Sequence, residues 1–199
     1  MRKFEPLLIA LLFIVITAFK ADNLPTQFNT LLNRAQLVFT PPEGMVEVPV
    51  TKNRQMNYEY ALKLADKNFE VRYTIRPLDS ALMKYADWEK NKKEGSVMIS
   101  PNKMYNTAIM AIMMNICGGG RMPKVGPYNA EAVKYEFNAD WGATAVGIPS
   151  GDFSTGYKYC VVTALHKDNV ADAYVFFLTD DQANLTTEIP KAFHTLKFK

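Results

Sequence analysis

The sequence predicts an α+β protein, in which an antiparallel β-sheet carries helices packed on its faces in an α/β/α sandwich. Three observations lead to this class. Two period-two runs joined by a short turn come early in the chain, two helical segments fill the middle, and two long apolar runs with a last helix complete it. Blocks of strands before and after a block of helices are typical of antiparallel sheets.

The N-terminus, residues 1–21, indicates a signal peptide. Arg2 and Lys3 precede an uncharged apolar run, 7–19, which is too short to span a bilayer comfortably. We expect a mature chain of residues 22–199 in the periplasm or outside the cell. The small residues preferred at a cleavage site are only partly present, so an uncleaved membrane anchor stays open as an alternative.

Residues 22–199 have the length of one domain, and they contain neither a repeat nor a long linker. Removal of the leader takes away three basic residues and one acidic residue, so the net charge falls from +3 to +1. The densest basic cluster, Lys90 to Lys93, lies between Glu89 and Glu94. This charge pattern does not fit a nucleic-acid-binding protein.

The first half of the domain predicts a short strand, a hairpin and two helices. The strand, 36–39, ends at a Pro-Pro-Glu-Gly break, and the hairpin pairs 58–65 with 69–76 across the turn 66–68. Each hairpin strand has one apolar and one largely polar face, so we expect the hairpin near a sheet edge or with one wet face. Helical spacing follows over 79–93 and 101–117; the second segment is apolar nearly all round, which predicts a buried helix.

The second half predicts further strands. Alternation indicates a strand over 133–138, and a Gly- and Ser-rich loop is expected over 143–156. Two strands, 157–165 and 172–179, are apolar on both faces and need cover on both. A helix over 180–193, which Pro190 must kink or end, leads to a closing strand at 195–198.

The order of these elements resembles the PsbP-like fold of extrinsic photosystem proteins and of a Ran-binding import factor. The stretches FNADWG (137–142) and YKYCVVTALHKDNVADAYVFFLTDD (157–181) are similar to exported proteins of Bacteroidetes-type bacteria. The resemblance implies a non-enzymatic accessory or binding protein, and it transfers architecture only, because no catalytic motif anchors it.

Catalytic motifs are absent from the sequence. GIPSG (147–151) lacks the spacing of a nucleophile elbow. Cys117 falls at the end of a helix and Cys160 inside an apolar strand, and both places disfavour a thiolate. Two buried free thiols and one disulfide remain open for this pair. His166 and His194 belong to no metal-binding pattern, so we predict neither a metal site nor a cofactor.

FNADWG looks most like a binding site. As a strand end, it would point Asn138 and Asp140 to one face, with Phe137 and Trp141 directed to the core. Together with Asp152, the residues Asn138, Asp140 and Trp141 are the candidate ligand-binding set. The alternative is that Asp140 and Asn138 anchor the following loop by hydrogen bonds.

The sequence therefore predicts an exported, non-enzymatic binding or accessory protein of the bacterial cell envelope. Its expected partner is another envelope protein or a small ligand, not nucleic acid, and a membrane only if the leader is retained. The alternative function is a small hydrolase that uses Asp140 with His166.

Overall fold

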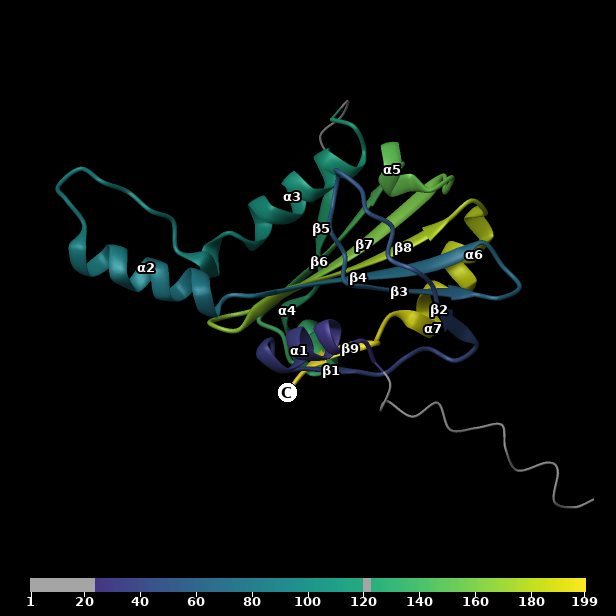
Figure 1. Ribbon diagram of the computed structural model, residues 1–199, viewed down its shortest axis with the longest axis horizontal. Coiled ribbons are helices and arrows are strands. Elements are labelled where there is room, and N and C mark those ends of the chain that lie inside the picture. The colour runs from purple at the N-terminus through teal and green to yellow at the C-terminus, as the bar shows by residue number, and fades with distance from the viewer. Residues whose placement is uncertain (1–23, 120–122) are drawn as a thin grey trace, which may run out of the picture.

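The computed structural model describes residues 24–119 and 123–199 (Figure 1). The predicted signal peptide, 1–21, lies outside the described residues. The structure has a large antiparallel sheet, a small second sheet and several helices, which confirms the α+β class.

Seven strands form the large sheet, and every neighbouring pair is antiparallel. In spatial order they are β2 (Met45–Glu47), β3 (Tyr60–Leu64), β4 (Phe69–Pro77), β8 (Ala171–Thr179), β7 (Tyr159–Lys167), β6 (Trp141–Gly147) and β5 (Val125–Pro127). The small sheet pairs β1 (Leu37–Phe39) with β9 (Leu196–Phe198).

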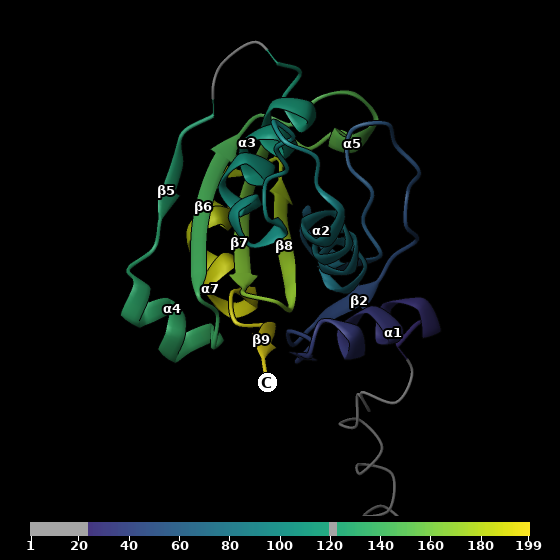
Figure 2. The same cartoon turned by 90° about the vertical axis from the view of Figure 1, so that its left-hand side faces the viewer.

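Helices cover both faces of the large sheet. One core joins it to α1 (Thr26–Arg34), α4 (Ala130–Phe137), α7 (Ile189–Ala192) and the small sheet. The opposite core joins it to α3 (Tyr105–Ile116) and α5 (Gly151–Ser154). Figure 2 shows α3 lying across β6, β7 and β8. The remaining helices are α6 (Gln182–Thr187), the 3-10 turn η2 (Pro101–Lys103) and α2 (Asp79–Asn91).

The central strand β8 explains why two cores exist. Its side chains alternate, with Val175 and Phe177 in the first core and Phe176 and Leu178 in the second. All nine residues of β8 are buried. The prediction that this apolar strand is dry on both faces is therefore confirmed.

The early hairpin lies near a sheet edge, as expected, because only the short strand β2 lies beyond β3, but its polar face is not wet. Its strands and turn are confirmed as β3 and β4, but β4 lies inside the sheet because it pairs with β8 along its whole length, from Phe69 to Pro77. Its polar face is consequently buried, with Arg72 and Thr74 almost without exposure. Hydrogen bonds and an ion pair with Glu70 compensate for the burial of these polar groups. Period-two alternation of apolar and polar residues cannot distinguish a buried, hydrogen-bonded polar face from a face in contact with water.

Residues 133–137 belong to the helix α4 and Asn138 is its C-cap, so the strand predicted over 133–138 is wrong. The side chain of Asn129 caps α4 by accepting hydrogen bonds from the N–H groups of Glu131 and Ala132. Val133 and Phe137, four residues apart, lie on the same buried helical face, so their spacing fits a helix as well as a strand. Asn138, at φ 50°, ends the helix in the left-handed conformation.

The predicted loop over 143–156 is also wrong. Most of its first part is β6, whose small residues, such as Ala143 and Ala145, are buried under α3. The short helix α5 follows at Gly151. The elements α1, β2 and β5 were not predicted from the sequence, whereas the break before Pro190 is confirmed by the division into α6 and α7.

Candidate functional site: an apolar groove at the base of an arm

Asn138 joins the end of α4 to the end of the chain. Its side-chain amide donates to the carbonyls of Lys199, at 2.7 Å, and Phe198, at 3.4 Å. Its own carbonyl accepts a hydrogen bond from Lys167 Nζ at 2.6 Å. All of these groups lie within the protein fold, so Asn138 has a bonding pattern that suits a structural anchor.

Asp140 holds the turn that leads into β6. Its Oδ1 accepts from Lys134 Nζ and its Oδ2 from the N–H of Asp168, both at 3.0 Å. Burial raises the pKa of the Asp140 carboxyl, but the hydrogen bonds from Lys134 and Asp168 outweigh this effect and leave the pKa below its usual value. Both oxygens are thus engaged by neighbouring elements.

Trp141 and Asp152 do not join Asn138 and Asp140 in one site. Trp141 belongs to the core under α3, where its ring packs on Tyr105 at 4.6 Å, whereas Phe137 belongs to the opposite core. The expectation that both rings point to one core is therefore wrong. Asp152 is exposed in α5, beyond the far end of β6, a strand about 20 Å long.

The imidazole of His166 is buried between two carboxylates. Its Nδ1 lies 2.6 Å from Asp172 Oδ1, and its Nε2 lies 2.9 Å from Asp168 Oδ1. Burial lowers the pKa of His166, but the two carboxylates outweigh it and raise the pKa above its ordinary value. The ring of Tyr105 covers the imidazole at 4.5 Å. Within the described residues, no hydrogen bond joins this ring to the Asp140 carboxylate.

This histidine is part of a row of side chains that crosses the sheet. Trp141, His166, Asp172 and Arg76 are directly opposite one another on β6, β7, β8 and β4. Directly opposite residues of an antiparallel sheet point to the same face. Arg76 continues the row by pairing with Glu59 at 2.7 Å. The row lies at the end of the sheet where α2 begins.

Here an arm projects from the body. The helix predicted over 79–93 is confirmed as α2, but its projection was not predicted from the sequence. We define the arm as α2 and the segment that returns from it, residues 79–100. Figure 1 shows the arm projecting from the body, and none of the residues of α2 is buried. At its base, the N–H of Leu78 donates to the carbonyl of Val170 at 2.9 Å, and Asn102 makes two hydrogen bonds with Asn169.

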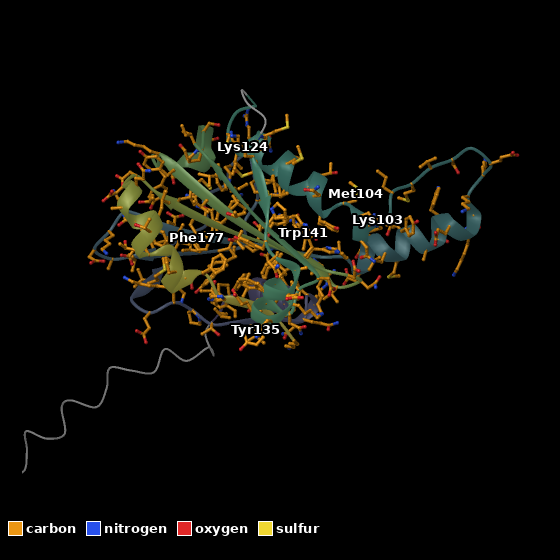
Figure 3. All side chains as sticks on the ribbon, turned by 180° about the vertical axis from the view of Figure 1, so that it is seen from behind. Lys103, Met104, Lys124, Tyr135, Trp141 and Phe177 are labelled. Atoms are coloured by element: carbon orange, nitrogen blue, oxygen red, sulfur yellow. The ribbon has the colours of Figure 1, made fainter. Side chains whose placement is uncertain are left out.

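An apolar groove of about 520 Å³ lies where the arm joins the body. Seven of its lining residues are apolar and one is charged: Leu78, Ala81, Val97, Met98, Ile99, Pro101, Met104 and Asp172. Figure 3 shows Met104 and Lys103 at this junction. Val97, Met98 and Ile99 are consecutive apolar residues, and all three are exposed, Val97 at 88% and Ile99 at 61%. Such a run of exposed apolar side chains is unusual.

The groove was missed because the sequence analysis treated 94–100 as a connection between two helices. The available signal was the apolar run Val97 to Ile99 between Gly95 and Pro101, where a connection is normally polar. Asp172 was assigned only to a strand. Its position in the groove depends on the pairing of β7 with β8 and on the path of the arm.

Other chemistries have little support in the site. Burial raises the pKa of both the Cys117 and the Cys160 thiol. Among the described side chains, no three His, Cys, Asp or Glu residues form a group that could hold a metal ion. Over residues 24–119 and 123–199, none of the helices combines the length and apolar character needed to cross a membrane.

Comparison with known proteins adds no relative from which a function can be transferred: no protein-family model matches the chain, and a search of curated proteins found no significant match.

Proposed function

We propose that the protein is an exported, non-enzymatic binding protein of the cell envelope, which holds an apolar segment of a partner protein in the groove. Export rests on the N-terminal sequence pattern. The observation that carries the binding function is the groove itself, an apolar surface at the base of an unburied arm.

The arm supports this proposal because its helix gains little stability from packing while it is uncovered. None of the 13 residues of α2 is buried, and isolated helices of about this length are marginal in water. The return segment adds Val97, Met98 and Ile99 to the exposed surface. Contiguous exposed apolar surface of this kind marks interaction sites in soluble proteins.

Asp172 defines the chemistry of the occupant. It is the only charged residue that lines the groove, and in the described ranges hydrogen bonds reach its carboxylate at Oδ1 alone. The ring of His166 lies between the carboxylates of Asp172 and Asp168, so even with a protonated ring this group of three carries a net negative charge. An apolar segment with one basic side chain would complement the groove, because the cation could donate to Asp172 Oδ2.

A protein segment fits the arm better than an anionic lipid surface. The four lysines of the arm, Lys84, Lys90, Lys92 and Lys93, are matched by four carboxylates, Asp79, Asp87, Glu89 and Glu94. Attraction to anionic lipids requires an excess of basic residues. Asp172 would also oppose a phosphate group in the groove.

Binding is favoured over hydrolysis by the state of His166. A general base needs a ring nitrogen that is free to accept a proton from substrate or water. Both nitrogens of His166 contact carboxylates, which stabilise the protonated ring. A PsbP-like fold, which we propose from the order of the elements, would agree with a non-enzymatic role.

The proposal is tested with fluorescent peptides and the mature chain. The probes are short peptides of Leu, Val and Met with one central Lys, Gln or Glu, and binding is measured by fluorescence anisotropy. We expect the Lys peptides to bind best. Ile99→Asp, which places a charge in the groove, should weaken binding about tenfold or more. Asp172→Asn should reduce the preference for Lys over Glu.

Met83→Asp is the matched control, because Met83 is an apolar residue of α2, in the same arm as Ile99, that is 74% exposed and does not line the groove. This variant should bind like the wild type. Equal binding by wild type and Ile99→Asp would overturn the proposal. So would tighter binding to anionic vesicles than to every peptide, which would make the arm a lipid-binding element.

A further inference from the structure

We propose that Cys117 and Cys160 form a disulfide bond that fixes the C-terminal end of α3 to β7. Both thiols are free in this structure, and their bonding is independent of the function proposed for the groove. The two cysteines come from different elements, since Cys117 follows the last residue of α3 and Cys160 is the second residue of β7.

Gly147 is a neighbour of both cysteines. It lies directly opposite Cys160 in the pairing of β6 with β7, so a side chain at 147 would stand on the same face as Cys160. A Cβ atom built at Gly147 would be only 2.4 Å from Cys117 Sγ. The sulfur of Cys117 therefore occupies the space above Gly147, beside the side chain of Cys160.

Cys117 and Cys160 both lie next to the Cβ position of Gly147. Opposite Cβ positions in an antiparallel pair are about 4.5–5.5 Å apart, and a disulfide joins Cβ atoms about 3.5–4.5 Å apart. The Cβ atom of Cys117 is 3.9 Å from the position of the Gly147 Cβ. Gly118 and Gly119 follow at φ 76° and 74°. A Cβ at Gly119 would meet nothing within 4 Å, whereas one at Gly118 would meet Ser150 Oγ at 3.1 Å.

Burial determines the order of the chemical steps. Cys160 is 0% exposed, whereas Cys117 is only partly buried and is the thiol that an external oxidant can reach. The Cys117 thiolate attacks a small disulfide, such as oxidised glutathione, and releases one glutathione thiolate. The sulfur of Cys160 then attacks Cys117 Sγ and releases the second. Two protein thiols are thereby oxidised, one glutathione disulfide is reduced, and both protons pass to solvent or the released thiolates.

The bond would stabilise α3, the helix that covers His166 beside the groove. It closes a long loop of chain between α3 and β7, which reduces the freedom of the unfolded state. At its other end, α3 begins with Tyr105, whose ring covers His166. We expect the thermal midpoint of the oxidised chain to exceed that of the reduced chain by about 5–10 °C.

The test compares the same wild-type chain after reduction and after incubation with oxidised glutathione. Intact mass and alkylation of the denatured chain report the thiols. We expect oxidation to remove two hydrogens from the mass, without a retained glutathione, and to protect both cysteines from alkylation. The double variant Cys117→Ser, Cys160→Ser is the control, and its thermal midpoint should not respond to the treatment.

Two results would overturn the proposal: both thiols still alkylated after prolonged oxidation, or glutathione retained on Cys117 as the final product. Because each result is read from wild-type protein, it does not depend on whether the serine variants fold.

Discussion

Asp140 shows at the level of one residue how a polar side chain serves the fold. Its carboxylate connects α4, through Lys134, to the turn between β7 and β8, through the N–H of Asp168. We expect Asp140→Ala to lower the free energy of unfolding by about 1–2 kcal/mol, because it leaves a backbone N–H without its partner. Urea unfolding measures the loss, and peptide binding should not change. Lost binding at unchanged stability would instead make Asp140 part of a ligand site.

His166 predicts a pH dependence of stability. Its pKa is raised in the folded protein above the ordinary value of 6.5, because the contacts with Asp172 and Asp168 outweigh burial. This stabilisation is complete below the unfolded pKa and is lost as the pH rises through the higher folded pKa. The free energy of unfolding should therefore fall on the alkaline side of pH 6.5. His166→Gln should remove this component, and an unchanged pH profile in the variant would contradict the assignment.

Gly147 predicts a specific steric conflict. An added methyl group would meet Cys117 Sγ at 2.4 Å and Met113 Cε at 3.0 Å. We expect Gly147→Ala to cost about 1–3 kcal/mol under reducing conditions, measured by urea unfolding. Cys117→Ala in the same chain should recover part of that loss, because it vacates the space. A purely additive double variant would mean that Cys117 is not the group in conflict.

At the scale of elements, sequence patterns predicted β3, β4, β7 and β8 and also the short strands β1 and β9, but they failed for α4 and β6. In β3 and β4 large apolar residues alternate with mostly polar ones, and β7 and β8 are continuous apolar runs, so both kinds of pattern were recognisable. In α4 the same reasoning failed, since the spacing of Val133 and Phe137 fits both periods and the Asn129 cap decides between them. In β6, the small residues Ala143, Thr144 and Ala145 differ too little in hydrophobicity to show a period.

The arm should unfold independently of the body, because α2 has no buried residue. Ala86→Gly, at an exposed position of α2, should cost the helix about 1 kcal/mol and reduce amide protection from hydrogen exchange there. The midpoint of global unfolding should stay as in the wild type. A fall in global stability of the same size would show that the arm folds as one unit with the sheet.

Across the whole molecule, the buried Arg72 connects the sheet to the segment around α5. Its guanidinium contacts Glu70 at 2.6 Å, the Phe153 carbonyl at 2.5 Å and Thr155 Oγ1 at 2.7 Å. Arg72→Met should destabilise the protein by about 3–5 kcal/mol, because Glu70 loses its partner in a buried position. The double variant Arg72→Met, Glu70→Gln should lose less, as measured by denaturant unfolding; an equal or larger loss would contradict this explanation.

The sequence predicted the class of the whole molecule but not its candidate site. Class follows from the order of strands and helices, which local patterns reveal. The groove depends on contacts between residues far apart in the chain, such as Asp172 and Ile99, and on an arm that leaves its apolar residues uncovered. The local pattern shows that Val97 and Ile99 are apolar, but not that the arm leaves them uncovered.

Hydrogen exchange of the mature chain, with and without the tightest-binding Lys peptide, tests the central claim most directly. We predict slower exchange of backbone amides in 97–104 and in the first turn of α2 when the peptide is bound, with no comparable change around Asn138 or Asp152. Protection confined to another surface, with the groove unchanged, would contradict the groove as the binding site.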